Sequence, residues 1–243
     1  MADFVGARSQ RGPTVAEQIK RYILDNKLRP GDPLPTENEL CAALGASRSS
    51  VREAVKTLHA LDIVEVRHGH GTYVGRLSLS ALVEGLTFRG LLSPDGDFAV
   101  LSDLVDAREL FERGMAERII GGLDADHLDR LDALVDEMGE RVGAGEDIVE
   151  CDRLFHSLLV APVGNELIRQ LSSACWDVYA IVAPFLNVIT VRDEVDTIEA
   201  HRNMVRAVRQ VDPAAFDLAV RAHYAPVRRR IAAARARTEQ APA

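Results

Sequence analysis

Cysteine is scarce in this sequence, which has only Cys41, Cys151 and Cys175 among its 243 residues. The three lie far apart and form no C-x-x-C pair, so they offer neither a disulfide framework nor a cysteine-based zinc motif. We therefore expect reduced, mostly buried thiols, which are typical of a cytoplasmic protein.

Long apolar runs are also missing. No uninterrupted apolar segment approaches the roughly 18 residues that a membrane-spanning helix needs. No basic segment followed by an apolar one opens the chain, so we expect no targeting leader. The sequence therefore predicts a soluble protein with no membrane partner.

Aromatic residues make up only 5% of the chain, although hydrophobic residues make up 47%. Alanine, leucine and arginine are plentiful instead, and this composition favours helices. The length and the hydrophobic content suffice to bury the core of one large domain or two ordinary ones.

The net charge of −8 is unevenly distributed along the chain. Residues 1–76 contain 11 Lys and Arg against 9 Asp and Glu, whereas the remaining 167 residues contain 18 against 28. A mildly basic N-terminal part therefore precedes an acidic remainder. This pattern fits a protein in which only the small N-terminal part contacts nucleic acid.

Two capping boxes mark helix starts in this N-terminal part. Thr14 and Glu17 form one box, and Thr36 and Glu39 form the other. The second of these helices should end at Gly45, because glycine readily takes the left-handed conformation that a sharp turn between helices needs. Between the two helices, residues 28–35 are too rich in proline to be helical and should form a stiff connection.

Ser47 can cap a third helix, which should run to about Ala60. Apolar residues at i, i+4 and i+7 give this helix one buried stripe. A polar cluster stands at the start of its other face and consists of Arg48, Ser49, Ser50 and Arg52. Backbone amides and the dipole at a helix N-terminus favour phosphate, and long arginines can reach guanine edges in a major groove.

A hairpin should follow this third helix. Residues 63–67 alternate and are β-branched, His68-Gly69-His70-Gly71 forms a turn, and residues 72–74 return. The two glycines would let the hairpin tip approach a sugar-phosphate backbone closely, with His68 and His70 as donors. The order of these elements predicts a winged helix-turn-helix. The alternative is a small helical bundle with a solvated charged face and an ordinary hairpin.

Residues 14–74 resemble the DNA-binding domain of the GntR family of bacterial transcription regulators. The residues that carry the resemblance are Arg29-Pro30-Gly31, the run from Leu34 to Leu40, Ser47-Arg48, the run from Val51 to Ala54, Leu58 and the run from Gly69 to Thr72. The resemblance implies DNA contacts by Ser47, Arg48, Ser49, Ser50, Arg52, His68 and Gly69. Asn38 departs from the pattern, because many members have an arginine there.

The rest of the chain shows helical periodicity throughout, which predicts an α-helical bundle. The expected helices are Leu79–Leu92, Asp97–Ile120, Asp126–Arg141, Glu146–Val160, Asn165–Val188, Asp193–Gln210 and Asp212–Arg235. Pro226 should kink or interrupt the last of them and could displace His223.

The predicted fold class is mainly α, with a winged helix-turn-helix before an all-α bundle. The predicted divisions are a flexible arm over 1–13, the winged helix-turn-helix over 14–75, a linker over 76–80, an all-helical ligand-binding and dimerisation domain over 81–235, and a frayed tail over 236–243.

Asp152 and His156 lie four residues apart on one expected helix, so both can reach a common ion. His201 and His223 lie on the last two expected helices. One carboxylate and three imidazoles suit zinc or another divalent transition metal. The alternative is that each histidine is separately buried or solvent-facing, since the sequence does not establish that the helices converge.

Residues from Leu101 to about Arg230 resemble the FCD effector-binding domain of the FadR subfamily of GntR regulators. The signature segments are 106–112, 152–156 with Asn165, 199–202 and 221–223. The resemblance implies that Asp152, His156, His201 and His223 hold a metal, with zinc favoured and nickel or manganese as alternatives. It also implies that Arg108 meets a ligand carboxylate, which a guanidinium can bind in bidentate fashion. The alternative for Arg108 is an ion pair with Glu112, a residue we expect to be structural.

These features predict a transcription regulator, and most members of the family that it resembles are repressors. A homodimer would bind a palindromic DNA operator, and a small organic or sugar acid at the metal would change its DNA affinity. One alternative is a metal-dependent enzyme that uses the Asp/His/His/His set. Another is a metal sensor, or a regulator whose metal is purely structural.

Overall fold

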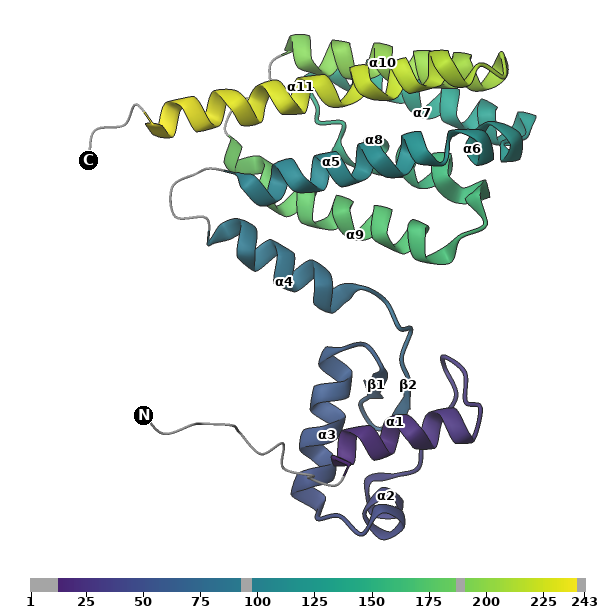
Figure 1. The fold of residues 1–243 in the computed structure, drawn as a ribbon, viewed down its shortest axis with the longest axis vertical. Coiled ribbons are helices and arrows are strands. Elements are labelled where there is room, and N and C mark those ends of the chain that lie inside the picture. The colour runs from purple at the N-terminus through teal and green to yellow at the C-terminus, as the bar shows by residue number, and fades with distance from the viewer. Residues whose placement is uncertain (1–12, 93–97, 187–190, 240–243) are drawn as a thin grey trace, which may run out of the picture. The chain divides into compact units, whose positions relative to one another are not determined.

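The computed structural model of this protein describes residues 13–92, 98–186 and 191–239. The chain divides into two compact units, Met1–Ala81 and Leu82–Ala243. The described residues form eleven α-helices, two short 3-10 helices and one two-stranded sheet, so the predicted fold class is confirmed (Figure 1). Nearly all of the arm expected over 1–13 lies outside the described residues.

The first unit contains three helices and the hairpin. They are α1 (Val15–Asp25), α2 (Glu37–Leu44), α3 (Arg48–Ala60), β1 (Val64–Arg67) and β2 (Gly71–Val74). Both predicted capping boxes are present, with Thr14 and Thr36 as the caps. Gly45 ends α2 in the left-handed region at φ 60°, as predicted. Local sequence signals therefore set the bounds of these helices.

The core of the first unit lies between α1, α2, α3 and the hairpin. Val51, Val55 and Leu58 form the buried stripe of α3. They belong to one apolar cluster with Ile19, Ile23, Leu34, Leu40, Ala54, Val64 and Val74. Burial of this stripe fixes which face of α3 points outward.

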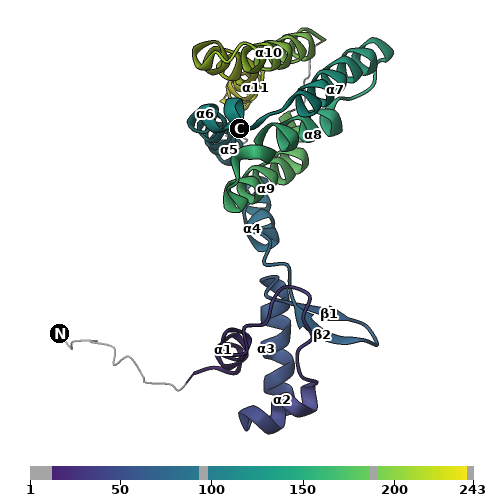
Figure 2. The same ribbon diagram turned by 90° about the vertical axis from the view of Figure 1, so that its right-hand side faces the viewer.

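The hairpin pairs β1 with β2 in antiparallel register from Val64↔Val74 to Arg67↔Gly71 (Figure 2). The proline-rich connection does more than join two helices, because Gly31 N–H donates to the Val74 carbonyl at 2.9 Å and Leu34 N–H donates to the Thr72 carbonyl at 2.8 Å. The connection thus runs along the free edge of β2 and supports the wing.

The second unit holds α4 (Ser80–Leu91, which begins at the unit boundary), α5 (Ala99–Gly114), α6 (Ala116–Gly122), α7 (Ala125–Ala144), α8 (Val149–Val160), the 3-10 helix η1 (Ala161–Val163), α9 (Glu166–Val182), η2 (Ala183–Leu186), α10 (Val191–Arg209) and α11 (Pro213–Glu239). None of the described helices is long and apolar enough to cross a membrane.

Two helices end earlier than the periodicity predicts. The helix expected over 97–120 is divided into α5 and α6 at Met115, which follows Gly114, a weak helix former. The helix expected to reach Val188 ends at Val182, and the chain tightens into η2 around Pro184, which has no amide hydrogen to donate. Residues 187–190 lie outside the described part of the chain.

The expected interruption at Pro226 is wrong. Helix α11 continues through Pro226 to Glu239 and includes residues 236–239, which we expected to fray. Pro226 is buried, and α11 packs against both α5 and α10, so tertiary contacts offset the lost backbone bond. The last turn is held by Arg237, whose Nη2 donates to the Leu186 carbonyl at 2.9 Å.

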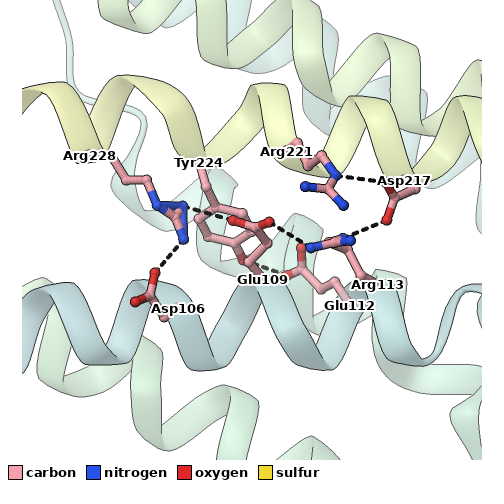
Figure 3. A network of polar contacts seen from close by, with 8 residues as sticks. All are labelled: Asp106, Glu109, Glu112, Arg113, Asp217, Arg221, Tyr224 and Arg228. Carbon is pink, nitrogen blue, oxygen red and sulfur yellow. Dashed lines mark hydrogen bonds and ion pairs between the residues drawn. The ribbon is translucent and has the colours of Figure 1, made fainter.

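Ion pairs join α5 to α11 along one side of the bundle (Figure 3). Arg113 Nε lies 2.5 Å from Asp217 Oδ1, and Arg228 pairs with both Asp106 and Glu109. These partly exposed pairs contribute little stability each, but together they fix the register of the two helices. That register places Tyr224 of α11 beside Glu112 of α5.

Candidate DNA-binding face and metal centre

The polar start of α3 is exposed in the first unit. Ser47 accepts a bond from the Ser50 amide at 3.1 Å, and its hydroxyl lies 2.8 Å from that of Ser49 and 2.9 Å from that of Ser50. Arg48 is exposed beside these hydroxyls. The buried stripe on the opposite face of α3 therefore presents these groups to solvent, where a phosphate or a base edge can reach them.

Arg52 lies one turn further along α3 and is held by α2. Its Nε lies 2.8 Å from Glu37 Oε2, and both side chains are largely exposed. This ion pair contributes little to stability, but it orients the guanidinium along the exposed face. The exposed Asn38 follows Glu37 on α2.

The wing tip consists of exposed residues His68, Gly69 and His70. Gly69 has φ +77°, a conformation in which a side chain would be strained. The Tyr73 hydroxyl donates to the His70 carbonyl at 3.1 Å, which braces the turn. The imidazoles of this tip are thus carried on a short, braced turn.

Three helices of the second unit bring the predicted ligand set together. Asp152 and His156 come from α8, His201 from α10 and His223 from α11. Nε2 of His156 lies 3.0 Å from Nε2 of His223 and 3.4 Å from Nε2 of His201. Oδ1 of Asp152 lies 3.3 Å from Nε2 of His156 and 3.1 Å from Nε2 of His201. We call these four residues the Asp/His cluster.

The Asp/His cluster is buried. His156 and His201 are 0% exposed and His223 is 6% exposed. The Phe155 ring lies 4.2 Å from that of His201, centroid to centroid. Packing of this kind fixes the orientation of each imidazole, so the convergence of the nitrogens is set by the helical core.

The contact with Glu112 indicates which nitrogen of His156 carries a proton. Nδ1 of His156 lies 2.5 Å from Oε1 of Glu112, so this nitrogen carries a proton, and in the neutral imidazole Nε2 then carries the lone pair. This lone pair can accept from Nε2 of His223 or bind a cation. Zinc binds imidazole nitrogen at about 2.0–2.1 Å, so neighbouring ligands of a tetrahedral ion lie about 3.3 Å apart. The four separations given above lie close to this value, and all four ligand atoms lie within 4.8 Å of one another.

The electrostatics of three members of the cluster favour the protonation states that a cation requires. The exception is His156, where burial acts to lower the pKa but the charge of Glu112 outweighs it and raises that pKa. Burial lowers the pKa of His201 and, more strongly, that of His223, so both imidazoles are neutral at pH 7. Burial acts to raise the pKa of Asp152, but hydrogen bonds from His156 and His201 outweigh it and hold that pKa well below its usual range. Metal ligands must be deprotonated, and these three groups are.

Arg108 lies beside the cluster in an aromatic setting. The Arg108 guanidinium carbon is 4.4 Å from the ring centroid of Trp176, 5.4 Å from that of Tyr224 and 5.8 Å from that of Tyr179. Arg108 is 3% exposed, yet its Nε and Nη2 have no hydrogen-bond partner. No ion pair joins Arg108 to Glu112 within the described residues, although the charges of the two side chains act on each other.

Arg108 and two members of the cluster, Asp152 and His223, line the same cavity, which has a volume of about 90 Å³. Its charged lining consists of two arginines and four acidic residues, namely Arg108, Arg230, Asp147, Asp152, Asp193 and Glu194. With neutral histidines this lining carries a formal charge of −2. A divalent cation would bring it to zero, so an anion can bind here at low electrostatic cost only with the cation present.

Comparison with known proteins shows which family this chain belongs to. Residues 12–74 match bacterial regulatory proteins of the gntR family, and residues 103–226 match the FCD domain. The chain belongs to the gntR family of bacterial regulatory proteins. It is a DNA-binding transcription regulator with an FCD domain.

Its relatives are transcription regulators and not enzymes. The regulator LutR of Bacillus subtilis is 31% identical over 61% of this chain and 66% of its own length. The galactonate operon transcriptional repressor of Escherichia coli is 25% identical over 88% of this chain and 93% of its own length. A solved GntR structure from Streptococcus agalactiae is 31% identical in sequence to this chain and matches it with a TM-score of 0.65. The match covers 88% of this chain and 97% of the Streptococcus agalactiae chain.

Sequence reasoning missed the role of Glu112 in this gntR-family protein. We expected a merely structural residue, but Glu112 is 1% exposed, lies against His156 Nδ1 and accepts from the Tyr224 hydroxyl at 2.9 Å. Burial acts to raise the pKa of Glu112, but the charges of His156 and Arg108 outweigh it, so the pKa is lowered. Its spacing from Arg108 on α5 was visible in the sequence, but its contact with α8 was not.

Glu112→Gln is expected to weaken zinc binding by about 10- to 100-fold, because an ionised carboxylate behind a ligand imidazole orients it and raises its basicity. Competition with a chromophoric chelator measures this affinity. Glu117→Gln is the matched control, since Glu117 is exposed on the neighbouring helix α6. Equal zinc affinity in the two variants would show that Glu112 does not support a metal ligand.

Proposed function

We propose that this regulator is a homodimeric repressor that binds a palindromic operator in the cytoplasm. A small organic or sugar acid would bind at the Asp/His cluster and release the operator. The observation that carries the proposal is the cavity of the second unit, which is lined by a buried arginine with two unpartnered donors and by Asp152 and His223 of the four convergent ligands. A relative named as the repressor of a galactonate operon supports both repression and a sugar acid.

The DNA contacts are assigned to the exposed start of α3 and to the wing. Arg48 and Arg52 would enter a major groove, while the hydroxyls of residues 47, 49 and 50 and the amides at the helix N-terminus meet phosphate. His68, Gly69 and His70 would approach the backbone beside that groove. A dimer would place two such helices about one DNA turn apart on a two-fold symmetric site.

The metal assignment rests on the donor set. Three imidazole nitrogens and one carboxylate oxygen suit zinc best, with nickel and manganese as alternatives. When bound, a divalent cation would supply the positive charge and a coordination position for a carboxylate oxygen of the acid. Asp152, His156, His201 and His223 would hold the cation, and Glu112 would orient His156.

Arg108 would bind the acid. Its unpartnered Nε and Nη2 are adjacent donors that match the two oxygens of a carboxylate. The cation–π contacts with Trp176, Tyr179 and Tyr224 hold the guanidinium in place at low entropic cost. The negative lining of the cavity makes acid binding dependent on the cation, so an apo protein should not respond to acid.

The acid would act by binding more tightly to the conformation that cannot hold the operator. Only a difference in acid affinity between the two conformations shifts the equilibrium between them. A coupling free energy of about 1–3 kcal/mol between acid binding and operator binding changes operator affinity roughly 5- to 150-fold. A metal sensor is the second candidate, because the unliganded lining already favours a cation. In a sensor, the cation alone would change DNA affinity.

The test uses protein purified without a histidine tag or chelator. Elemental analysis should give about one transition metal per chain, and an operator selected from random DNA should lose affinity when acids are added to the metal-loaded protein but not to the apo protein. A DNA response to metal alone, with no effect of any acid, would favour the sensor. Absence of metal after reconstitution with zinc, nickel or manganese would refute the metal centre.

A further inference from the structure

A second hollow, which we call the arginine groove, lies between the start of α10 and the C-terminal half of α11. Its volume is about 440 Å³. Four of its seven lining residues are arginines and one is acidic: Leu186, Arg192, Asp193, Arg229, Arg230, Ala233 and Arg237. A concave surface with this excess of guanidinium groups attracts anions.

Not all of this positive charge is neutralised inside the protein. Arg229 is paired with carboxylates, at 3.0 Å from Asp193 and 2.8 Å from Asp196. Arg237 instead donates to a neutral carbonyl, that of Leu186. Arg192 is exposed at the first turn of α10. Arg192 and Arg237 can therefore add their charge to a ligand without breaking an internal ion pair.

The arginine groove adjoins the cavity of the Asp/His cluster. Asp193 and Arg230 line both hollows. Arg230 also hydrogen-bonds to the side chain of Tyr179, whose ring lies 5.8 Å from the Arg108 guanidinium. A single tyrosine thus separates the buried arginine of the cavity from the arginines of the groove.

The two hollows differ greatly in size. The cavity has a volume of about 90 Å³, against about 440 Å³ for the groove. A ligand too long for the cavity would extend out of it. The arginine groove lies beyond the shared residues Asp193 and Arg230. Its lining therefore determines which chemical groups are favoured in the part of the ligand that extends out of the cavity.

We propose that the effector has two anionic groups, one in the cavity and the other in the arginine groove. The first is the carboxylate already assigned to Arg108, so this inference rests on the proposed function. The second is a carboxylate or a phosphate that Arg192, Arg230 and Arg237 bind. Charge-assisted hydrogen bonds to guanidinium groups give such a dianion a higher affinity than a monoanion of the same length.

The acidic residues at the cavity favour a different ligand, one whose second group is a cation and not an anion. Asp147 and Glu194 line the cavity but not the groove. Acids of equal chain length separate the two cases, because only the terminal group varies. One set is butyrate, succinate and 4-aminobutyrate, and the longer set is hexanoate, adipate and 6-aminohexanoate.

The experiment titrates zinc-loaded full-length protein with both sets and follows the fluorescence of Trp176, the only tryptophan of the chain. The diacid of at least one set should bind about tenfold more tightly than its monoacid, as expected for an added charge-assisted contact. Arg192→Gln combined with Arg237→Gln should remove this preference and leave monoacid affinity unchanged. Arg209→Gln on α10 is the control, since Arg209 pairs with Asp129 and Asp132 on α7.

The outcomes also separate this inference from the proposed function. If monoacids bind through Arg108, as judged by loss of binding in Arg108→Gln, and diacids bind no more tightly, the groove assignment is overturned and the acid site stands. Preference for the amino acids over the diacids overturns the assignment in the same way. If no acid of either set binds zinc-loaded protein, both the acid site and the groove assignment are overturned. A phosphate-terminated acid tests which anionic group the groove prefers.

Discussion

Replacing His201 with alanine is expected to lower metal content and the response to acid together. His201 contributes one of four converging ligand atoms, 3.1 Å from Asp152 Oδ1 and 3.4 Å from His156 Nε2. Loss of a residue behind a ligand already costs about 10- to 100-fold in metal affinity, so loss of a ligand itself should cost about 100-fold or more. Because the cavity lining is negative without a cation, acid affinity should fall with metal occupancy.

Thermal unfolding separates loss of metal from loss of fold. A ligand present at 100 times its Kd stabilises the native state by about 2.7 kcal/mol, so zinc should raise the Tm of the wild type but not that of the variant. The control is His127→Ala, which removes a histidine at the surface of α7 that lies outside the Asp/His cluster. If His201→Ala retains full metal occupancy, His201 is not a ligand.

Local signals in the sequence predicted most of the first unit, because its helix ends depend on neighbouring residues. Thr14, Thr36 and Ser47 cap where their spacing indicates, and Gly45 adopts the left-handed turn. The role of residues 31–34 was not predictable in this way, since their pairing with β2 joins segments about forty residues apart in the sequence.

The candidate metal centre shows where this local reasoning stops. The i,i+4 spacing of Asp152 and His156 follows from helical geometry alone. The approach of His201 and His223 to α8 depends on how α8, α10 and α11 are placed in the bundle, which the ligand spacing does not encode. Glu112 was missed for the same reason, as its partner His156 is 44 positions away. The interruption expected at Pro226 does not occur, because packing of α11 outweighs one lost backbone bond.

Replacing Arg48 with alanine is expected to abolish operator selectivity while the first unit stays folded. Arg48 is exposed at the first position of α3, where we propose that it meets base edges. A good bidentate contact to a base contributes roughly 1–3 kcal/mol of discrimination, and a dimer makes it twice, so selectivity should fall on the order of 100-fold or more. Binding to random DNA should persist, because the remaining phosphate contacts do not depend on sequence.

The comparison that isolates base recognition is between Arg48→Ala and Arg21→Ala. Arg21 is also an exposed arginine of the first unit, but it lies on α1. Both changes remove one positive charge, so both weaken any general attraction to DNA by a similar amount. Affinities for the operator and for a scrambled sequence, measured at several salt concentrations, give the selectivity of each variant. Only Arg48→Ala should bring the two affinities close together. If Arg48→Ala keeps the wild-type ratio, base recognition belongs to other residues of α3 or to the wing.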